Sequence, residues 1–399
     1  MKKIAMFSMG TRGDIQPYIY LSNELIKSGF EVTFGSHPCW RELIEDNGII
    51  FKQVGPDIDI EKETAKIRGK HSNPMISMLK TAKFIFRIIQ DSTNEIYDIC
   101  NGKDLIIVTH SHMGAVEAEV LGIPTVNVTL QTEMIAEKLK KKTLKNKILG
   151  SIIAKQVSKP YNKIRKVYGL KAVNDMDEMM SKQLNLIPIS SYVIERNPYW
   201  EDKNVITGYW YEEEDYNPPA HLLEFLKSGE KPVILALGAM SFEDKSEKEK
   251  LEMFINAFEK TGCRAIIQGF QKTLMDYELP YNMIACGNVP HSWLFKQGLF
   301  VIHHCGFGTT AASFIYAIPS IPVPHILDQK GFAKQLYDAG VATSPINAKD
   351  LSEERITKAI FEMKQSYNDK KSLSYEISKM IKSEGGVKEA VRLIKEITD

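Results

Sequence analysis

The sequence predicts an α/β protein made of two Rossmann-like domains, each a doubly wound parallel sheet, that face each other across a cleft. Three observations predict this class. The 399 residues exceed the length that one core usually supports, so two domains of about 200 residues each are expected. Short apolar runs alternate with longer helical patterns, which indicates βαβ units. The alternation breaks once and then resumes, which predicts two domains in tandem.

The elements fall into two series. After the first strand-like run, a helical pattern extends from Pro17 to Gly29, and acidic residues before Pro218 and Pro219 later interrupt both helix and sheet. Gly385 and Gly386 precede a terminal helical pattern. The strand-like runs are 2–9, 30–36, 103–110 and 123–130, then 231–240, 263–269, 282–289, 298–304 and 318–324. We therefore expect a first domain at 1–212, a linker at 213–222, a second domain at 223–384 and a separate helix at 385–399.

Composition narrows the class of function. With 51 Lys and Arg against 50 Asp and Glu, the net charge of +1 indicates no nucleic-acid partner. The cysteines are scattered, without ligand spacing for zinc, and are typical of reduced thiols: Cys39, Cys100, Cys263, Cys286 and Cys305. No apolar run reaches the roughly 18 residues of a membrane span, and the N-terminal run is too short for a signal peptide. A cytoplasmic protein is expected.

The stretch from Phe300 to Ala342 has the features of an anion site. A strand ends at His304, Gly306 and Gly308 allow close backbone approach, and Thr309 opens a helix whose N-terminus favours phosphate oxygens. A tight turn is the simpler alternative for two glycines after a strand. Further on, Asp328 and Gln329 combine a carboxylate with an amide, a pair that can bind vicinal sugar hydroxyls or can serve as a surface or capping dipeptide.

These residues, together with three other motifs, resemble the UDP-glycosyltransferases of the GT-B fold, in particular the sterol and antibiotic glucosyltransferase branch. The motifs are GTRGDIQPYIYLSNELIKSGFEVTF (10–34), DLIIVTHSHMGAVEAEVLGIPTV (104–126), VPHSWLF (289–295) and the HHCGFGTT…P…DQ segment (303–329), and the resemblance covers nearly the whole chain. It implies an inverting, metal-independent hexosyltransferase. In this fold the last helix crosses back to the first domain.

The resemblance also implies roles for single residues in donor binding. His304 and the backbone at Gly306, Gly308 and Thr309 correspond to the diphosphate site, Asp328 and Gln329 to the sugar site, and Val289 and His291 to the uracil and ribose site. The family frequently has a phosphate-binding serine where this chain has Ala239, and Ser241 is expected to compensate. Phe270 stands where relatives often have a tryptophan, and it can still pack on a base.

Asp14 is the candidate catalytic base. Sugar transfer to a hydroxyl needs a group that takes the acceptor proton, and Asp14 follows the first strand between Gly10 and Gly13 on the one side and Pro17 on the other. Its position corresponds by resemblance to the family's base, whereas the structural alternative is an N-cap for a helix that begins near Ile15. An ordinary carboxylate is a weak base, so we expect His110 to pair with it.

Some of these predictions have open alternatives. His112 is as reachable for Asp14 as His110, and either histidine can instead be satisfied by backbone. Asp57 to Asp59 and Asp175 to Asp177 mimic a metal-binding Asp-x-Asp, but they lie in polar segments and we interpret them as solvated. The Met- and Phe-rich helix at 74–89 suits either an apolar acceptor or a core. The basic segment 137–171 suits either peripheral membrane contact or a solvated helix face.

The expected function is transfer of a hexose, glucose first, from a UDP-sugar to a hydroxyl of a lipophilic natural product such as a sterol, polyketide, flavonoid or lipid. The UDP-sugar is a co-substrate, and neither a cofactor nor a metal is expected. Two alternatives belong to other classes of function. One is a UDP-sugar epimerase of the same architecture, and the other is a non-catalytic sugar-nucleotide-binding helper of a partner glycosyltransferase.

Overall fold

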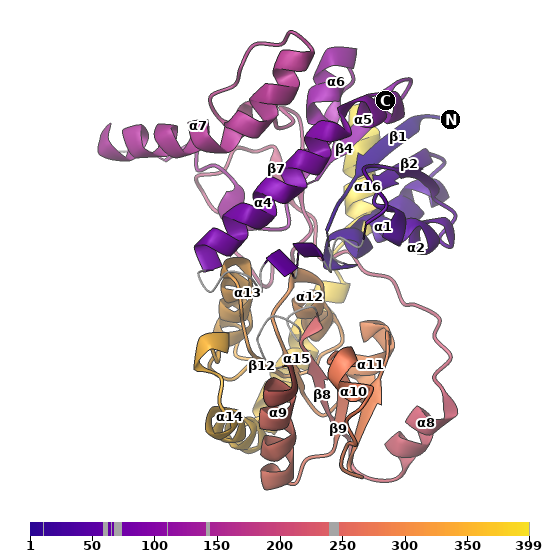
Figure 1. Cartoon of the computed structure of the whole chain (residues 1–399), viewed down its shortest axis with the longest axis vertical. Coiled ribbons are helices and arrows are strands. Elements are labelled where there is room, and N and C mark those ends of the chain that lie inside the picture. Colours follow the sequence, from indigo (N-terminus) through magenta and orange to yellow (C-terminus); the bar gives the residue numbers. More distant parts are fainter. Residues whose placement is uncertain are drawn as a thin grey trace.

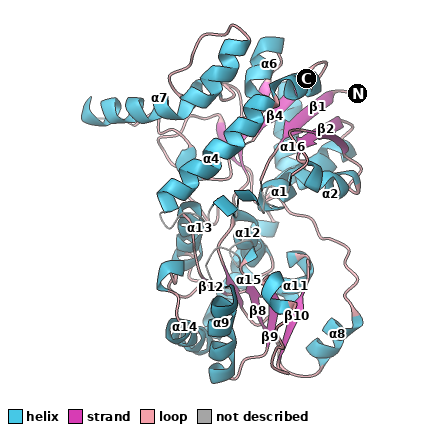
Figure 2. Ribbon diagram, in the orientation of Figure 1, coloured by secondary structure: helices cyan, strands magenta, loops and turns pink. Residues whose placement is uncertain are grey.

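The computed structural model describes residues 1–10, 12–58, 63–64, 66–67, 74–109, 111–140, 144–238 and 247–398. Its two halves lie one above the other along the long axis, and each contains a sheet enclosed by helices (Figures 1 and 2). All strand pairs are parallel, in the orders β3-β2-β1-β4-β5-β6-β7 and β10-β9-β8-β11-β12. The α/β class with two Rossmann-like sheets is therefore confirmed.

The seven-stranded sheet belongs to the N-terminal half. Its buried strands are rich in Ile, Val and Phe, as expected for strands covered on both faces. The strands are β1 (Lys3–Phe7), β2 (Glu31–Ser36), β3 (Ile50–Gln53), β4 (Leu105–Val108), β5 (Thr125–Val128), β6 (Asn185–Ile187) and β7 (Asn204–Ile206). The helices are α1 (Arg12–Lys27), α2 (Arg41–Glu45), α4 (Pro74–Asp91), α5 (Thr93–Cys100), α6 (Ala115–Leu121) and α7 (Leu144–Val167), with 3-10 turns at Pro38–Trp40, Thr132–Met134 and Met176–Met179.

The five-stranded sheet belongs to the C-terminal half. Its strands are β8 (Val233–Ala236), β9 (Ala265–Gln268), β10 (Met283–Cys286), β11 (Val301–His303) and β12 (Ser320–Pro322). Its helices are α8 (Ala220–Lys227), α9 (Glu247–Thr261), α10 (Gln271–Leu274), α11 (His291–Gln297), α12 (Phe307–Ile315), α13 (Leu327–Asp338), α14 (Glu353–Gln365) and α15 (Tyr367–Lys382), with a 3-10 turn at Ala348–Asp350. The expected strands of both series are present, whereas β3, β6 and β7 were not identified from the sequence.

The last helix, α16 (Gly386–Thr398), leaves the C-terminal half and lies beside α1 in the N-terminal half (Figure 1). Ala390, Val391 and Ile394 on its buried face join the core around Ile4 and Ile15. A second contact between the halves comes from α12, because Phe307 in its first turn packs against the same N-terminal core. The two halves therefore share apolar surface, and α1 and α12 lie in contact at the place where they meet.

Candidate active site

The predicted site residues that the structure describes follow the carboxyl end of β1 in the N-terminal sheet and those of β10, β11 and β12 in the C-terminal sheet. In the N-terminal sheet, β1 stands between β2 and β4, and the strand order changes direction there. In the C-terminal sheet, β8 stands between β9 and β11 in the same way. The loops after such strands diverge and leave a crevice at the carboxyl ends, which is where open α/β sheets bind ligands. Asp14 follows β1, and His304 follows β11.

Asp14 lies in the first turn of α1, half-buried. The helix already includes Arg12, so Asp14 occupies a position inside the helix and the N-cap alternative is wrong. The Ser8 hydroxyl donates a hydrogen bond to the Asp14 carbonyl oxygen, with 2.6 Å between the oxygens. Gly10 has a φ of +147°, and a Cβ on it would overlap the Asp14 carboxylate. Gly10 is thus required both for the turn after β1 and for the space that Asp14 occupies.

His304 is held by the backbone of β8 and by a glycine of its own loop. Its Nδ1 lies 3.4 Å from the Ala236 carbonyl oxygen. A Cβ on Gly306 would lie 2.5 Å from His304 Nε2, so only glycine fits there with the ring in this place. Burial lowers the pKa of His304 to about 4, so the imidazole is neutral at pH 7. His304 therefore offers a neutral donor rather than a full positive charge.

The helix α12 begins directly after this loop, with Gly306 as its N-cap residue and no side-chain cap. The first backbone N–H groups of a helix have no partner within the helix, and they carry the positive end of the helix dipole. A Cβ on Gly308 would meet no atom within 4 Å, so the surface over the first turn is open at that residue. Thr309 is buried and its carbonyl accepts from Ser313. This geometry suits the anion site that the sequence predicts.

Asp328 and Gln329 open α13 at the carboxyl end of β12. Gln329 is 3% exposed, and its Oε1 accepts hydrogen bonds from the backbone N–H groups of His325 at 2.8 Å and Ile326 at 3.3 Å. Its oxygen therefore shapes the loop before the helix. Asp328 is partly buried, and its pKa is raised, chiefly by burial and further by the carboxylates of Asp14 and Glu133. The structure thus brings the predicted base and the predicted sugar-binding acid within electrostatic reach.

The predicted nucleoside site is less open than its sequence indicates. The Val289 carbonyl accepts a hydrogen bond from Gln268 Nε2 at 2.8 Å, and its N–H donates to Gly287. His291 begins α11 and stacks on Phe295 with ring centroids 4.6 Å apart. Burial, with smaller contributions from His304 and Arg12, lowers its pKa to about 4. Phe270 is entirely buried in the core, so it presents no face to a base.

Four other residues adjoin the site although sequence reasoning gave them no role. The charge of Arg12 lowers the pKa of His291, and the charge of Glu133 raises the pKa of Asp328. Tyr18 is fully buried, and its pKa is raised by burial and by Asp14. His325 donates through Nδ1 to the Val323 carbonyl oxygen at 2.8 Å, while its Nε2 is buried and has no hydrogen-bond partner. All four stand within a few residues of a strand's carboxyl end or in the first turns of α1. That position in the sequence is the feature by which they could have been identified.

Two predicted site residues, His110 and Ser241, lie outside the described residues, and their roles stay predictions. His112 is described: its φ is +52°, and its ring packs on the edge of Tyr161 with centroids 5.7 Å apart. The Tyr161 hydroxyl in turn donates to the Ser111 carbonyl at 2.8 Å. Which histidine serves Asp14 stays open.

The Asp-x-Asp segments do not form a metal site in the part of the chain that the structure describes. Asp175 caps a 3-10 turn and accepts a hydrogen bond from the Asp177 N–H, and Asp177 pairs with Lys138. Asp59 lies outside the described residues. Within the described ranges, no group of three His, Cys, Asp or Glu side chains is arranged to hold a metal ion.

The basic segment 137–171 forms α7 and its flanks. Figure 1 shows α7 extending beyond the rest of the N-terminal half. Arg165 is buried and pairs with Glu119, with N–O distances of 2.5 and 2.9 Å, and Lys140 pairs with Glu137. Part of the charge is therefore neutralised within the protein. Among the helices of the described residues, none is both long and apolar enough to cross a membrane. Membrane contact by this segment stays a prediction.

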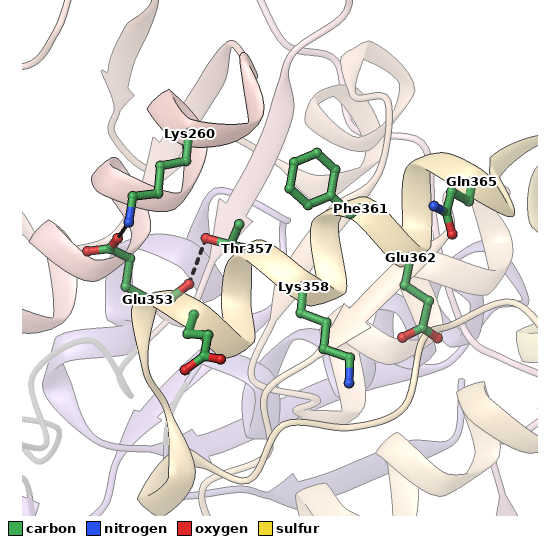
Figure 3. A pocket seen from close by; sticks show the side chains of 8 residues that line it. Lys260, Glu353, Thr357, Lys358, Phe361, Glu362 and Gln365 are labelled. Carbon is green, nitrogen blue, oxygen red and sulfur yellow. Dashed lines mark hydrogen bonds and ion pairs between the residues drawn. The ribbon is translucent and has the colours of Figure 1, made fainter.

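The helix predicted at 74–89 is α4, and its described face contributes to the core. Ile88 and Ile89 are buried, and the Phe86 ring meets Tyr161 edge to face at 5.1 Å. A groove of about 600 Å³ lies elsewhere, between α9 and α14, and Figure 3 shows it lined by Lys260, Glu353 and other mostly charged side chains. None of the site residues described above lines that groove, so it belongs to the surface of the C-terminal half.

Comparison with known proteins agrees with this geometry. The model of the glycosyltransferase family 28 N-terminal domain matches residues 4–158. Curated relatives include the sterol 3-beta-glucosyltransferases of Candida albicans, 29% identical, and of Arabidopsis thaliana, 27% identical, and each alignment covers 98% of this chain. The chain spans 27% and 64% of the length of these two proteins, and 35% of the Saccharomyces cerevisiae enzyme.

Solved structures show the same fold. The glycosyltransferase VinC in complex with dTDP has a TM-score of 0.75 at 18% identity, with 99% of both chains covered. The spinosyn rhamnosyltransferase SpnG complexed with spinosyn aglycone has a TM-score of 0.71 at 16% identity, with 100% of both chains covered. The GT-B fold that the sequence predicts is therefore confirmed. With residues 4–158 matching the glycosyltransferase family 28 N-terminal domain and 98% of its length aligned with sterol 3-beta-glucosyltransferases, the chain is a GT-B protein that is similar to these enzymes.

Proposed function

We propose that this chain transfers glucose from UDP-glucose to the hydroxyl of a lipophilic acceptor of the sterol class, with inversion at C1 and with Asp14 as general base. One observation supports the proposal most. The Asp14 carboxylate of the N-terminal half contributes to the raised pKa of Asp328 in the C-terminal half, and α12, which follows His304, packs against both α1 and α13, the helices that contain these two residues. The residues proposed as base, sugar-binding acid and anion site thus lie at the starts of α1, α13 and α12, and α12 packs against the other two helices.

The proposed reaction is a single displacement. The acceptor oxygen attacks C1 of the glucose while its proton passes to the Asp14 carboxylate. The bond between C1 and the β-phosphate oxygen breaks, and its electron pair leaves with the diphosphate. The N–H groups at the start of α12 and the neutral His304 then stabilise the developing charge by hydrogen bonds in a partly desolvated site. Asp328 would bind sugar hydroxyls as a carboxylate.

The relatives support the proposed sugar and the proposed class of acceptor. The aligned curated proteins are named sterol 3-beta-glucosyltransferases, which favours glucose and a sterol hydroxyl. The structural relatives bind dTDP or a spinosyn aglycone, so a thymidine diphosphate donor is the first alternative to test. Since the chain spans only part of the length of the sterol enzymes, acceptor choice is tested over several hydrophobic alcohols.

The first prediction concerns Asp14→Asn. Replacing the base by an amide of similar size should lower acceptor-dependent UDP release by a factor of about 100 or more, because the acceptor proton has no receiver. UDP affinity should change by less than about threefold, since Asp14 is not placed to hold the nucleotide. The assay measures UDP release from UDP-glucose with sterols, phenols and hydrophobic alcohols, with chelator present.

The outcomes separate the candidate functions. Glucoside formation by wild type that is lost in Asp14→Asn supports the proposal. UDP release without any acceptor would favour the epimerase, and tight UDP binding without turnover would favour the non-catalytic helper. Equal turnover by Asp14→Asn would remove Asp14 from the mechanism. Asp46→Asn, a change to a carboxylate that follows α2, is the control and should leave turnover unchanged.

A further inference from the structure

We propose that Arg12 is the cation that binds the diphosphate of the donor, and that it is held by Glu214 of the interdomain linker until the nucleotide replaces that carboxylate. The inference rests on the proposed function, because it assumes a nucleoside diphosphate donor. It assigns a role to Arg12, two positions before Asp14 in the sequence, and it links donor binding to the segment that joins the two halves.

The anion site needs a cation that its histidines do not supply. Burial lowers the pKa of His304 and His291 to about 4 and that of His325 to about 3, so all three rings are neutral at pH 7. The start of α12 contributes only about half a positive charge. A diphosphate carries about two negative charges, and it gains more as the bond to C1 breaks. Neutral donors and one helix dipole leave most of this charge uncompensated.

Arg12 stands where it can supply the charge. It is the first residue of α1, and α1 packs against α12, the helix that opens the anion site. Its guanidinium lowers the pKa of His291, and the neighbouring His304 does the same, so the three groups surround one region. The Arg12 side chain is 42% exposed, so it has room to turn toward a ligand. A second cation, Lys250 of α9, lowers the pKa of His325. It is only 5% exposed, so it has less room than Arg12 to turn toward a ligand.

Two of the groups that hold Arg12 are ones that a phosphate can replace. Arg12 Nε donates to Gln16 Oε1 at 3.2 Å, and a terminal nitrogen lies 3.7 Å from Glu214 Oε2. Glu214 also accepts a hydrogen bond from the Tyr20 hydroxyl at 3.1 Å. A long, half-exposed ion pair contributes little to stability, whereas a guanidinium forms strong bidentate hydrogen bonds with phosphate. Exchange of Glu214 for the diphosphate is therefore favourable, and Tyr20 remains as a partner for Glu214.

An ion pair at the residue directly before the linker provides a matched control. Glu212 pairs with Lys27 at 3.0 Å and accepts from Asn23 at 2.7 Å, at the far end of α1. Lys27→Gln therefore removes one cation of α1 and one ion pair to this acidic segment, as Arg12→Gln does. Lys27 lies in the last turn of α1, four turns from the anion site. A nonspecific effect of charge or of linker attachment should appear in both variants.

The test measures binding of uridine, UMP, UDP and dTDP to the full chain by titration calorimetry, for wild type, Arg12→Gln, Arg12→Lys, Lys27→Gln and Glu214→Gln. Arg12→Gln should weaken UDP binding by tenfold or more and leave uridine binding within twofold. Arg12→Lys should recover part of the loss, because the charge remains while the bidentate geometry is lost. Glu214→Gln should strengthen UDP binding two- to fivefold, and Lys27→Gln should leave all four ligands unchanged.

Failure of this inference and failure of the proposed function give different results. Wild type that binds neither UDP nor dTDP would overturn the proposed donor class, and this inference with it. Wild type that binds UDP, with Arg12→Gln binding it equally well, would overturn only the role of Arg12. Equal weakening of uridine and UDP by Arg12→Gln would show a structural role instead and would also overturn it. Thermal unfolding of each variant identifies any that does not fold. If Arg12→Gln does not fold, UDP binding by Arg12→Lys is compared with that of wild type instead.

Discussion

Gly306 and Gly308 stand two residues apart at the start of α12, but their surroundings differ. A Cβ on Gly306 would lie 2.5 Å from the His304 ring, whereas a Cβ on Gly308 would meet nothing within 4 Å. Gly306 is therefore required by the packing of the His304 ring within the protein. The space over Gly308 is left open by the protein, which is expected where a ligand approaches backbone N–H groups closely. The two glycines thus serve different needs within one motif.

This difference gives a prediction at the scale of single residues. Gly308→Ala should leave the free energy of unfolding unchanged or raise it by up to about 1 kcal/mol, because alanine favours helix. It should weaken UDP binding, since the methyl group occupies the approach to the phosphate. Gly306→Ala should reduce both stability and UDP affinity by displacing His304. Chemical denaturation and UDP titration of the two variants check this, and unaltered UDP affinity in Gly308→Ala would place the diphosphate elsewhere.

At the scale of elements, α6 contains a buried acid that the reaction does not use. Glu117 lies in the first turn of α6 and is 2% exposed. Backbone N–H groups at the helix start favour its charge, but burial is the larger effect and raises its pKa to about 7 from 4.5. One of its oxygens, Oε1, is buried without a hydrogen-bond partner. The carboxyl is therefore close to half protonated at neutral pH.

The stability of the protein should depend on pH through Glu117. Between pH 4.5 and 7 the folded state binds more protons at this residue than the unfolded state, so the free energy of unfolding falls as pH rises through this window. The decrease in the free energy of unfolding across this window is on the order of 3 kcal/mol, since one pKa unit corresponds to about 1.4 kcal/mol. Glu117→Gln should remove this part of the pH dependence and be the more stable protein at pH 8. Urea unfolding at pH 5, 7 and 8 measures it, and parallel curves for both proteins would contradict the raised pKa.

At the scale of the whole molecule, the two halves are joined by three features rather than by the linker alone. The linker contacts both halves, because Glu214 pairs with Arg12 of α1 and Glu213 with Lys296 of α11. The helix α12 packs Phe307 against the N-terminal core. The helix α16 belongs to the N-terminal core although α15 before it packs in the C-terminal half. Changes in α16 should therefore affect the N-terminal half, far away in sequence.

Ile394→Ala tests this coupling. Ile394 is fully buried beside β1 and α1 residues, so its truncation should lower the free energy of unfolding by about 2 to 5 kcal/mol. Hydrogen exchange should accelerate in β1 and α1 more than in β8 and β9, because the cavity lies in the N-terminal core. Lys395→Ala, at an exposed position of the same helix, serves as control and should change neither measurement. Equal acceleration in both sheets would indicate that the halves unfold as one unit.

The sequence by itself determined the α/β class, the tandem arrangement and most of the strands, because these depend on apolar periodicity within short windows. It also located Asp14, His304 and Asp328, since polar and glycine residues directly after buried strands are a local signal. The strands β3, β6 and β7 were missed because polar residues shorten their apolar runs: β3 ends in Lys52 and Gln53, and β6 and β7 begin at Asn185 and Asn204. The position of Asp14 inside α1 escaped it too, because the helix starts earlier than its apolar pattern.

Only the tertiary structure decided how these residues act together. Asp14 and Asp328 are 314 positions apart in the chain, and their proximity follows from the packing of two sheets rather than from any local pattern. The neutral state of His304 and His291 is likewise a property of the folded interior, since desolvation depends on every neighbour that excludes water. The pairing of Arg12 with Glu214 has the same origin. Charge states and contacts across the cleft depend on the long-range packing that short sequence windows do not contain.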